Sequence, residues 1–127
     1  MRRALIVMLA VLILALGLSG AGYGYLCASV DAAEALRAGA VLAADRGDPD
    51  RAAQLLTQLA ELWEKRRPIL EMIAPHDALH EARVAIVEAK ICLECGDHDD
   101  FLRTAAVAAE SLAHIRDEEA VSFENLY

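Results

Sequence analysis

Two histidines of the chain, His76 and His80, are separated by four positions. On a helix this spacing places both side chains on one face, where two imidazoles can bind one metal ion. The segment departs from the zinc-protease pattern H-E-x-x-H, because Asp77 stands where that pattern has a glutamate base. A structural interpretation competes with the metal site: His80 lies on an apolar stripe and bonds to a neighbour, while His76 helps to begin the helix.

Two cysteines, Cys92 and Cys95, form the pattern C-x-x-C, which outside the cytoplasm is typical of a disulfide or a redox pair. A redox pair normally stands at a helix N-terminus, whose dipole favours the thiolate. Here the pair stands at a predicted helix C-terminus beside Glu94, where the dipole and the carboxylate both disfavour a reactive thiolate. We expect plain thiols, with a local disulfide as the alternative. Cys27 is expected to be an ordinary interfacial residue close to the membrane, with a link between two chains as the alternative.

A zinc site that joins the two motifs on one helix is excluded, because His80 and Cys92 would lie about 18 Å apart along its axis. Zinc ligands lie only about 2.0–2.3 Å from the metal. Cys92, Cys95 and His98 converge only if the chain turns at Gly96, and a nearby aspartate would then have to complete the set. The alternative functional hypothesis is therefore a metal- or redox-responsive protein. Its candidate residues are His76, His80, Cys92, Cys95 and His98.

The helix that positions these residues is predicted to run roughly from His76 to Cys95, with Pro75 before it and Gly96 as its stop. One apolar stripe along it consists of Leu79, Ala82, Ile86, Ala89 and Leu93. A second stripe on a different face consists of His80, Val84, Val87, Ile91 and Cys95. The helix is therefore expected to touch neighbours on two sides. The residues predicted to bind a partner are Trp63, His80, Val84, Val87 and Ile91.

Three further helices are expected around this one. The first covers residues 30–46 and ends at Gly47, and the second begins after the cap Asp48 with Pro49 in its first turn. The second is expected to close at the basic run 65–67, because Pro68 disfavours continuation, so that residues 69–74 form a turn or a bent segment. The last helix starts at Asp97 and should end near residues 116–119. The expected architecture is all-α: two antiparallel helical hairpins in a four-helix bundle, tetratricopeptide-like in local style.

The N-terminal block is uncharged from Ala4 to Leu26, which is long enough to span a membrane. Arg2 and Arg3 precede the block, so the positive-inside rule keeps the N-terminus in the cytoplasm and exports the remainder of the chain. The predicted division is an anchor over residues 1–27, with residues 4–26 in the lipid, and an extracytoplasmic helical domain over 28–127. A cleaved signal peptide, with Ser19-Gly20-Ala21 as its processing site, is the alternative.

The net charge of the chain excludes one class of partner. Twelve Lys and Arg stand against twenty Asp and Glu, for a formal charge of −8, which argues against a nucleic-acid partner. No Ser-His-Asp set, phosphate loop or pair of catalytic carboxylates is recognisable, so we assign no catalytic or cofactor-binding residue and expect no enzymatic activity. The spacing of Gly20 and Gly24, G-x-x-x-G, suits close approach of two membrane helices, but glycine is also simply common in such helices.

Several of these features together resemble one family: the N-terminal anchor, the Gly-Asp turn, Trp63, His76 and a terminal pattern of Glu119, Ser122, Asn125 and Leu126. They are similar to domain-of-unknown-function family 4363. The resemblance implies a small bacterial protein with one membrane helix and an all-α outer part, and it implies no activity. The last four residues, 124–127, also match the start of a protease tag site, so they are either native or a tag remnant.

The sequence therefore predicts a single-pass membrane protein that displays an acidic helical bundle outside the membrane as an interaction or scaffold module. A protein partner is expected, and the chain would be accessory to another membrane protein.

Overall fold

The computed structural model describes the chain over residues 1–126, and its side chains as far as residue 120. Four helices account for almost all of it: α1 (Arg2–Asp45), α2 (Pro49–Ile73), α3 (His76–Glu94) and α4 (His98–Leu126). No strand occurs within residues 1–126, so the predicted all-α class is confirmed. The terminal pattern at 122–126 and the tag-like residues 124–127 lie outside the part whose side chains are described.

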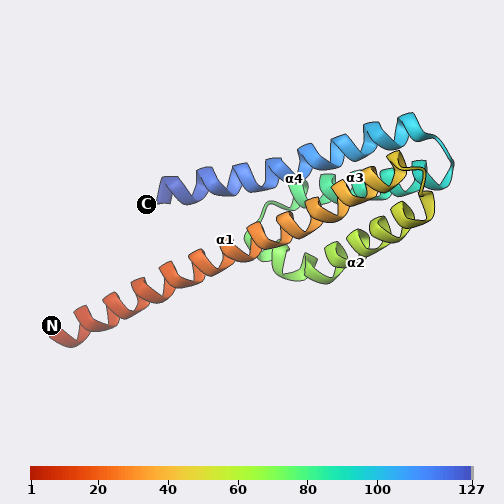
Figure 1. Cartoon of the computed structure of the whole chain (residues 1–127). Helices are drawn as coiled ribbons and strands as arrows, with labels where there is room; N and C mark the ends of the chain where they lie inside the picture. Colours follow the sequence, from red (N-terminus) through yellow and green to blue (C-terminus); the bar gives the residue numbers. More distant parts are fainter. Residues whose placement is uncertain (127) are drawn as a thin grey trace.

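Helix α1 is one uninterrupted helix from the N-terminus into the bundle (Figure 1). The helix expected over residues 30–46 is only its second half, and no break falls at the predicted boundary between 27 and 28. Every residue from 2 to 21 is exposed, whereas the stretch from Leu26 to Ala43 supplies six buried side chains. The same helix therefore carries a fully exposed apolar segment and, after it, a face that is buried in the core.

Both Gly-Asp turns are built in the same way. Gly47 and Gly96 have positive φ angles of 78° and 76°, which a residue without Cβ adopts without strain. The amides of Asp48 and Asp97 donate back to the carbonyls of Ala43 and Cys92, at 2.9 and 3.2 Å. Their carboxylates in turn accept from the backbone amides of the next helix, each at 3.0 Å. The predicted cap Asp48 is confirmed, Asp97 caps α4 in the same way, and each turn sends the chain back along the helix it has just left.

Helix α2 does not end where the sequence analysis placed its end. Pro68 lies inside the helix, which continues to Ile73, so the expected turn over residues 69–74 is wrong. The physical reason is packing: Leu70, one turn before the true end, is completely buried. Burial of a leucine offsets the hydrogen bond that a proline removes from a helix. Helix α4 also runs further than predicted, to Leu126, because no Gly or Pro interrupts residues 117–126.

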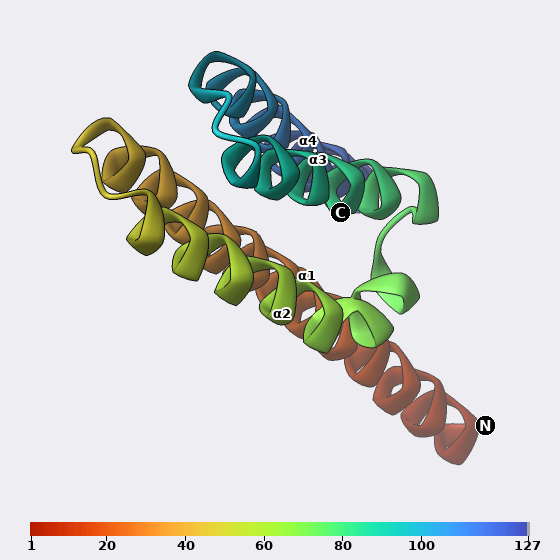
Figure 2. The ribbon, with the colours of Figure 1, turned by 90° about the vertical axis from the view of Figure 1, so that its right-hand side faces the viewer.

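The four helices surround one core. Helix α1 packs against α2 and α4, and α3 also packs against α2 and α4, so α1 and α3 stand diagonally. Figures 1 and 2 show α3 running in the same direction as α1, with α2 and α4 returning. The first predicted stripe of α3 is buried from Leu79 to Ala89 and half-buried at Leu93, and the largest core side chains are Trp63 and Phe101. Alanines occupy many contact positions, which lets the helix axes approach closely; the likeness to tetratricopeptide hairpins stays a prediction.

Two neighbouring substitutions test whether the part of α2 after Pro68 is packed against the core. Leu70→Ala should lower the free energy of unfolding by about 2–5 kcal/mol, because it leaves a cavity in the core. Ile69→Ala removes a side chain that is 50% exposed and should cost less than about 0.5 kcal/mol. Chemical denaturation of the full chain in detergent, followed by circular dichroism, measures both. Equal effects of the two substitutions would contradict the packed end of α2.

Candidate functional site

The outer face of α3 carries a row of apolar side chains that stay exposed in the described part of the chain. Val84, Val87 and Ile91 are 40%, 43% and 53% exposed. Ile91 follows the buried Ala82 by nine residues, which is two and a half helical turns, so the row lies directly opposite the core face. His80 and Cys95, also exposed, continue it at either end. We call these five residues the α3 outer stripe.

The outer stripe is the second stripe of the sequence analysis, and its surroundings differ from the expectation. Helix α3 was expected to touch neighbours on two sides of its apolar pattern. Helix α3 packs against α2 and α4, and its first stripe is largely buried, whereas the side chains of the outer stripe remain exposed, with Val87 lining a hollow beside α2. His80 is exposed, so the interpretation of a histidine held within an apolar contact does not apply.

Trp63 occupies a different environment from the other residues predicted to bind a partner. Its side chain is only 2% exposed and belongs to the core. It also borders a shallow hollow between α2 and α3, whose lining includes Arg83 and Val87. Its indole Nε1 is buried and has no hydrogen-bond partner among the described side chains. Trp63 is therefore a core residue that lines the same hollow as Val87 of the outer stripe, and it is not itself an exposed binding residue.

Charged residues flank the outer stripe asymmetrically. On the side towards α2 stand Arg83 and, seven residues later, Lys90; Arg83 Nε lies 2.7 Å from Glu64 Oε1 of α2. On the side towards α4 stand Glu81 and, seven residues later, Glu88. A repeat of seven keeps each pair on one flank of a helix. The apolar row thus has a basic border and an acidic border.

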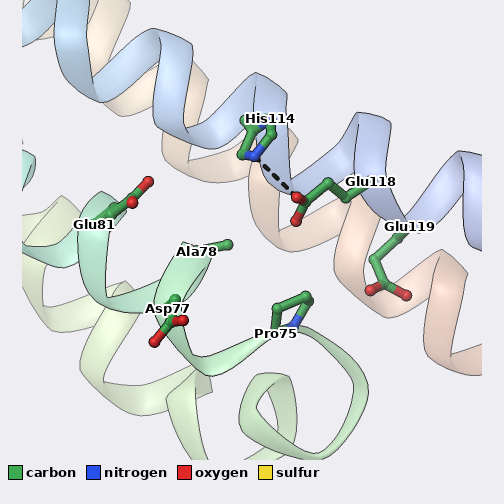
Figure 3. Close-up of a pocket in the computed structure, with 7 residues that line it drawn as sticks. All are labelled: Pro75, Asp77, Ala78, Glu81, His114, Glu118 and Glu119. Atoms are coloured by element: carbon green, nitrogen blue, oxygen red, sulfur yellow. Dashed lines mark ion pairs between the residues drawn. The ribbon is translucent and has the colours of Figure 1, made fainter.

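A second hollow lies between the start of α3 and the distal part of α4 (Figure 3). Its lining is acidic: Asp77, Glu81, Glu118 and Glu119, with the imidazole of His114 3.0 Å from Glu118. Burial raises the pKa of the Glu119 carboxyl, and repulsion by the neighbouring Glu118 raises it further. Despite its carboxylates, no group of three or more potential ligands in the described chain is arranged to hold a metal ion.

The predicted metal and redox candidates are dispersed over the surface. His76 Nε2 lies 3.9 Å from Glu71, and His98 Nε2 lies 3.4 Å from Asp45, so these two histidines face different helices. Cys92 and Cys95 are free thiols, the first half-buried and the second exposed, and Cys27 is also free. Within residues 1–126 the structure gives the metal and redox hypothesis no assembled site.

Two arginines hold α1 where it enters the bundle, and the sequence analysis missed both roles. Arg66 of α2 lies over the ring of Tyr25, 5.5 Å from its centroid, and donates to Ser29 Oγ at 3.0 Å. Arg116 of α4 donates to Asp31 and to the carbonyl of Cys27. The basic run 65–67 was expected to close α2, but it lies inside the helix. No local pattern signals these contacts, because the partners are far apart in sequence.

The exposed part of α1 is the most apolar surface of the molecule. One window of this helix is long and apolar enough to cross a membrane, with a mean hydropathy of 2.7 and none of it buried. An N-terminal signal sequence has the same properties. In Figure 1 the N-terminal end of α1 projects beyond the other three helices.

Comparison with known proteins gives one match. A family model described as "Domain of unknown function (DUF4363)" matches residues 22–126. The match begins at the point where α1 starts to enter the bundle and covers all of α2, α3 and α4. No curated protein and no solved structure matches the chain.

The raised pKa of Glu119 has a consequence for stability. A folded state that binds the proton more tightly than the unfolded chain loses stability as pH rises through the window above the ordinary carboxyl range. Glu119→Gln should therefore raise the unfolding midpoint at pH 7, and this gain should disappear when the pH is lowered to about 4. Thermal unfolding at several pH values measures it. Glu110→Gln, which alters an exposed carboxylate of the same helix, is the control and should show no such dependence.

Proposed function

The chain belongs to the DUF4363 family, whose description assigns no activity, and from its surfaces we propose that it is a membrane-anchored helical interaction module. In this proposal, α1 tethers the chain through the exposed part of the predicted span 4–26, before the buried Leu26, and the rest of the chain up to residue 126 forms a four-helix bundle of two antiparallel hairpins. The bundle presents the α3 outer stripe to a protein partner. It acts as an accessory to another membrane protein and performs no chemistry of its own.

The exposed half of α1 is the observation that carries the proposal. A contiguous apolar surface that extends over residues 4–21 is rare on a soluble monomer, and such surfaces mark membrane or protein contacts. A helix rises about 1.5 Å per residue, so a segment of about 20 residues matches the hydrocarbon thickness of a bilayer. Since the segment is a helix, its backbone donors and acceptors are already bonded within it, as a lipid environment demands.

Orientation follows from charge. Arg2 and Arg3 are the only charged residues before Asp31, and basic residues are retained on the cytoplasmic side. The bundle would then lie outside the cytoplasm. The same location results if the segment is a signal peptide that is cleaved after Ala21, but the bundle would then be released from the membrane.

The outer stripe supports the interaction part of the proposal. Three aliphatic side chains in one row at helical spacing suit contact with another helix. The polar and charged borders give such a contact direction and specificity. A metal or redox role is not proposed, because the candidate histidines and thiols are not brought together in the part of the chain that the structure describes.

Anchoring is testable with arginine substitutions on one helix. The double substitution Leu9→Arg and Leu12→Arg should release the chain from membranes, because each arginine costs about 2.5–3.5 kcal/mol at the centre of a span. Leu42→Arg, on the exposed face of the same helix within the bundle, should leave the chain membrane-bound. Alkaline extraction of isolated membranes measures the distribution. A soluble wild-type chain whose N-terminus begins near Gly22 would replace the anchor by a signal peptide.

Orientation is testable through the exposed thiol at the end of α3. A maleimide that does not cross membranes should label Cys95 in intact cells, because the bundle is expected outside the cytoplasm. Cys95→Ser should remove most of the signal, which separates it from the half-buried Cys27 and Cys92. Labelling that appears only after the cells are lysed would place the bundle in the cytoplasm and contradict the proposed topology.

A further inference from the structure

The outer stripe follows a heptad pattern on the exposed face of α3. The intervals between His80, Val84, Val87 and Ile91 are four, three and four residues, which is the spacing of the contact seam of a coiled coil. In heptad notation, Val84 and Ile91 occupy a positions, and His80 and Val87 occupy d positions. The borders are then the e positions, Glu81 and Glu88, and the g positions, Arg83 and Lys90.

We propose that the partner of this face is a second copy of the chain, with α3 packed against α3 in parallel about a two-fold axis normal to the membrane. The proposal rests on the proposed function in one respect, because it uses the membrane anchor to orient the two copies. It also names the class of partner, which the proposed function leaves open.

The charged borders select the parallel arrangement. In a parallel pair, each g position faces the e position five residues further along the other helix. Arg83 then meets Glu88 of the partner subunit, and His76 meets Glu81 of the partner subunit. In an antiparallel pair, e positions face e positions and g positions face g positions. Glutamate would then meet glutamate and Arg83 would meet Lys90 of the partner subunit, so like charges would border both sides of the seam.

Arg83 can serve this contact without giving up its own. Its Nε is 2.7 Å from Glu64 within the chain, yet the guanidinium offers five N–H donors. The remaining donors are available to a second carboxylate, and the arginine side chain is 46% exposed. The intramolecular pair fixes the guanidinium beside the outer stripe, so that less side-chain entropy is lost when another chain binds.

Membrane geometry requires the same arrangement independently. Helix α3 runs in the direction of α1 (Figure 1), and two chains inserted with the same orientation present α3 in the same direction. A two-fold axis along the membrane normal therefore gives parallel α3 helices and no other pairing. Since α1 and α3 are diagonal in each bundle, the two anchors stand on opposite outer sides of the pair. The seam thus needs no contact between Gly20 and Gly24 of the two membrane helices.

The size of the seam fits association within a membrane. Three partly exposed aliphatic residues form a small contact, which by itself gives weak binding in free solution. Confinement of both copies to one membrane, with a shared orientation, raises their effective concentration.

Disulfide cross-linking of the full chain in native membranes tests the seam. In a background with Cys27, Cys92 and Cys95 replaced by serine, Val87→Cys and Ile91→Cys should each give a same-residue cross-linked dimer under mild oxidation. Leu42→Cys is a matched control, because Leu42 is similarly exposed but lies on α1, diagonal to the seam. Equal dimer formation at 42 and 87, or none at 87 and 91, would overturn the proposal.

A charge swap that leaves the cysteines intact provides the second test. Arg83→Glu and Glu88→Arg should each lower co-purification of two differently tagged copies by about tenfold, because two flanking pairs become repulsive. Co-expression of the two variants should restore pairing, since each g–e contact between them is again one Glu and one Arg. A merely structural role of Arg83 beside Glu64 would give no such rescue. Stronger association of Arg83→Glu alone would indicate an antiparallel pair and overturn the proposal.

The outcomes separate this inference from the proposed function. If Val87→Cys cross-links to a different membrane protein and not to itself, the second copy is ruled out while the interaction module stands. If Gly20→Cys cross-links to itself and the α3 positions do not, the two chains meet through their membrane helices, and the α3 seam is ruled out. If the wild-type chain is not retained in membranes, the anchor fails and the proposed function fails with it.

Discussion

The uninterrupted course of α1 is the constraint on which the rest of the molecule depends. One rigid helix carries an apolar segment that water disfavours and, directly after it, a face that must be buried by other helices. The change occurs within about two turns, between residues 21 and 29, with no flexible linker. Any tilt of the apolar segment is therefore transmitted to the bundle, and under the proposed anchoring the surface that the bundle presents is fixed relative to the membrane.

The contacts around that transition explain how the bundle holds its end of the helix. Arg66 approaches α1 from α2 and Arg116 approaches it from α4, so the same stretch is gripped from two sides. Guanidinium groups suit this position, because they stack on an aromatic ring and donate to carbonyl and hydroxyl oxygens at once. Arg37 adds a third tie further along, since it pairs with Glu34 and donates to the carbonyl of Ala105 in α4. These polar contacts lie at the end of the bundle where the buried part of α1 begins.

Local chemistry made much of this fold predictable from the sequence. The Gly-Asp turns, the cap at Asp48 and the first apolar stripe of α3 follow from glycine conformation, hydrogen bonding and helical period, and the structure has each of them. The end of α2 was not predictable in this way, because a proline rule is local while the burial of Leu70 depends on helices distant in sequence. For the same reason no pattern announced the contacts of Arg66 and Arg116. The family resemblance was recognisable and is confirmed, yet it supplies no activity.

The outer stripe of α3 is the point at which local sequence and monomer fold disagree. Valine has lower helix propensity than alanine or leucine, because its branched side chain loses freedom against the preceding turn. Val84 and Val87 therefore lower the stability of the helix slightly, and their apolar side chains are also partly exposed to water. In the core, packing offsets the same cost, whereas these two side chains remain 40% and 43% exposed. On a solvent-exposed helix face without a binding role, Glu, Lys or Gln would be the usual residues at these positions, and α3 has charged residues on both borders of the stripe. The proposed pairing would cover this outer face, and a partner that complements its charges as well as its apolar row is basic where α3 is acidic and acidic where it is basic. A parallel copy of α3 has that distribution.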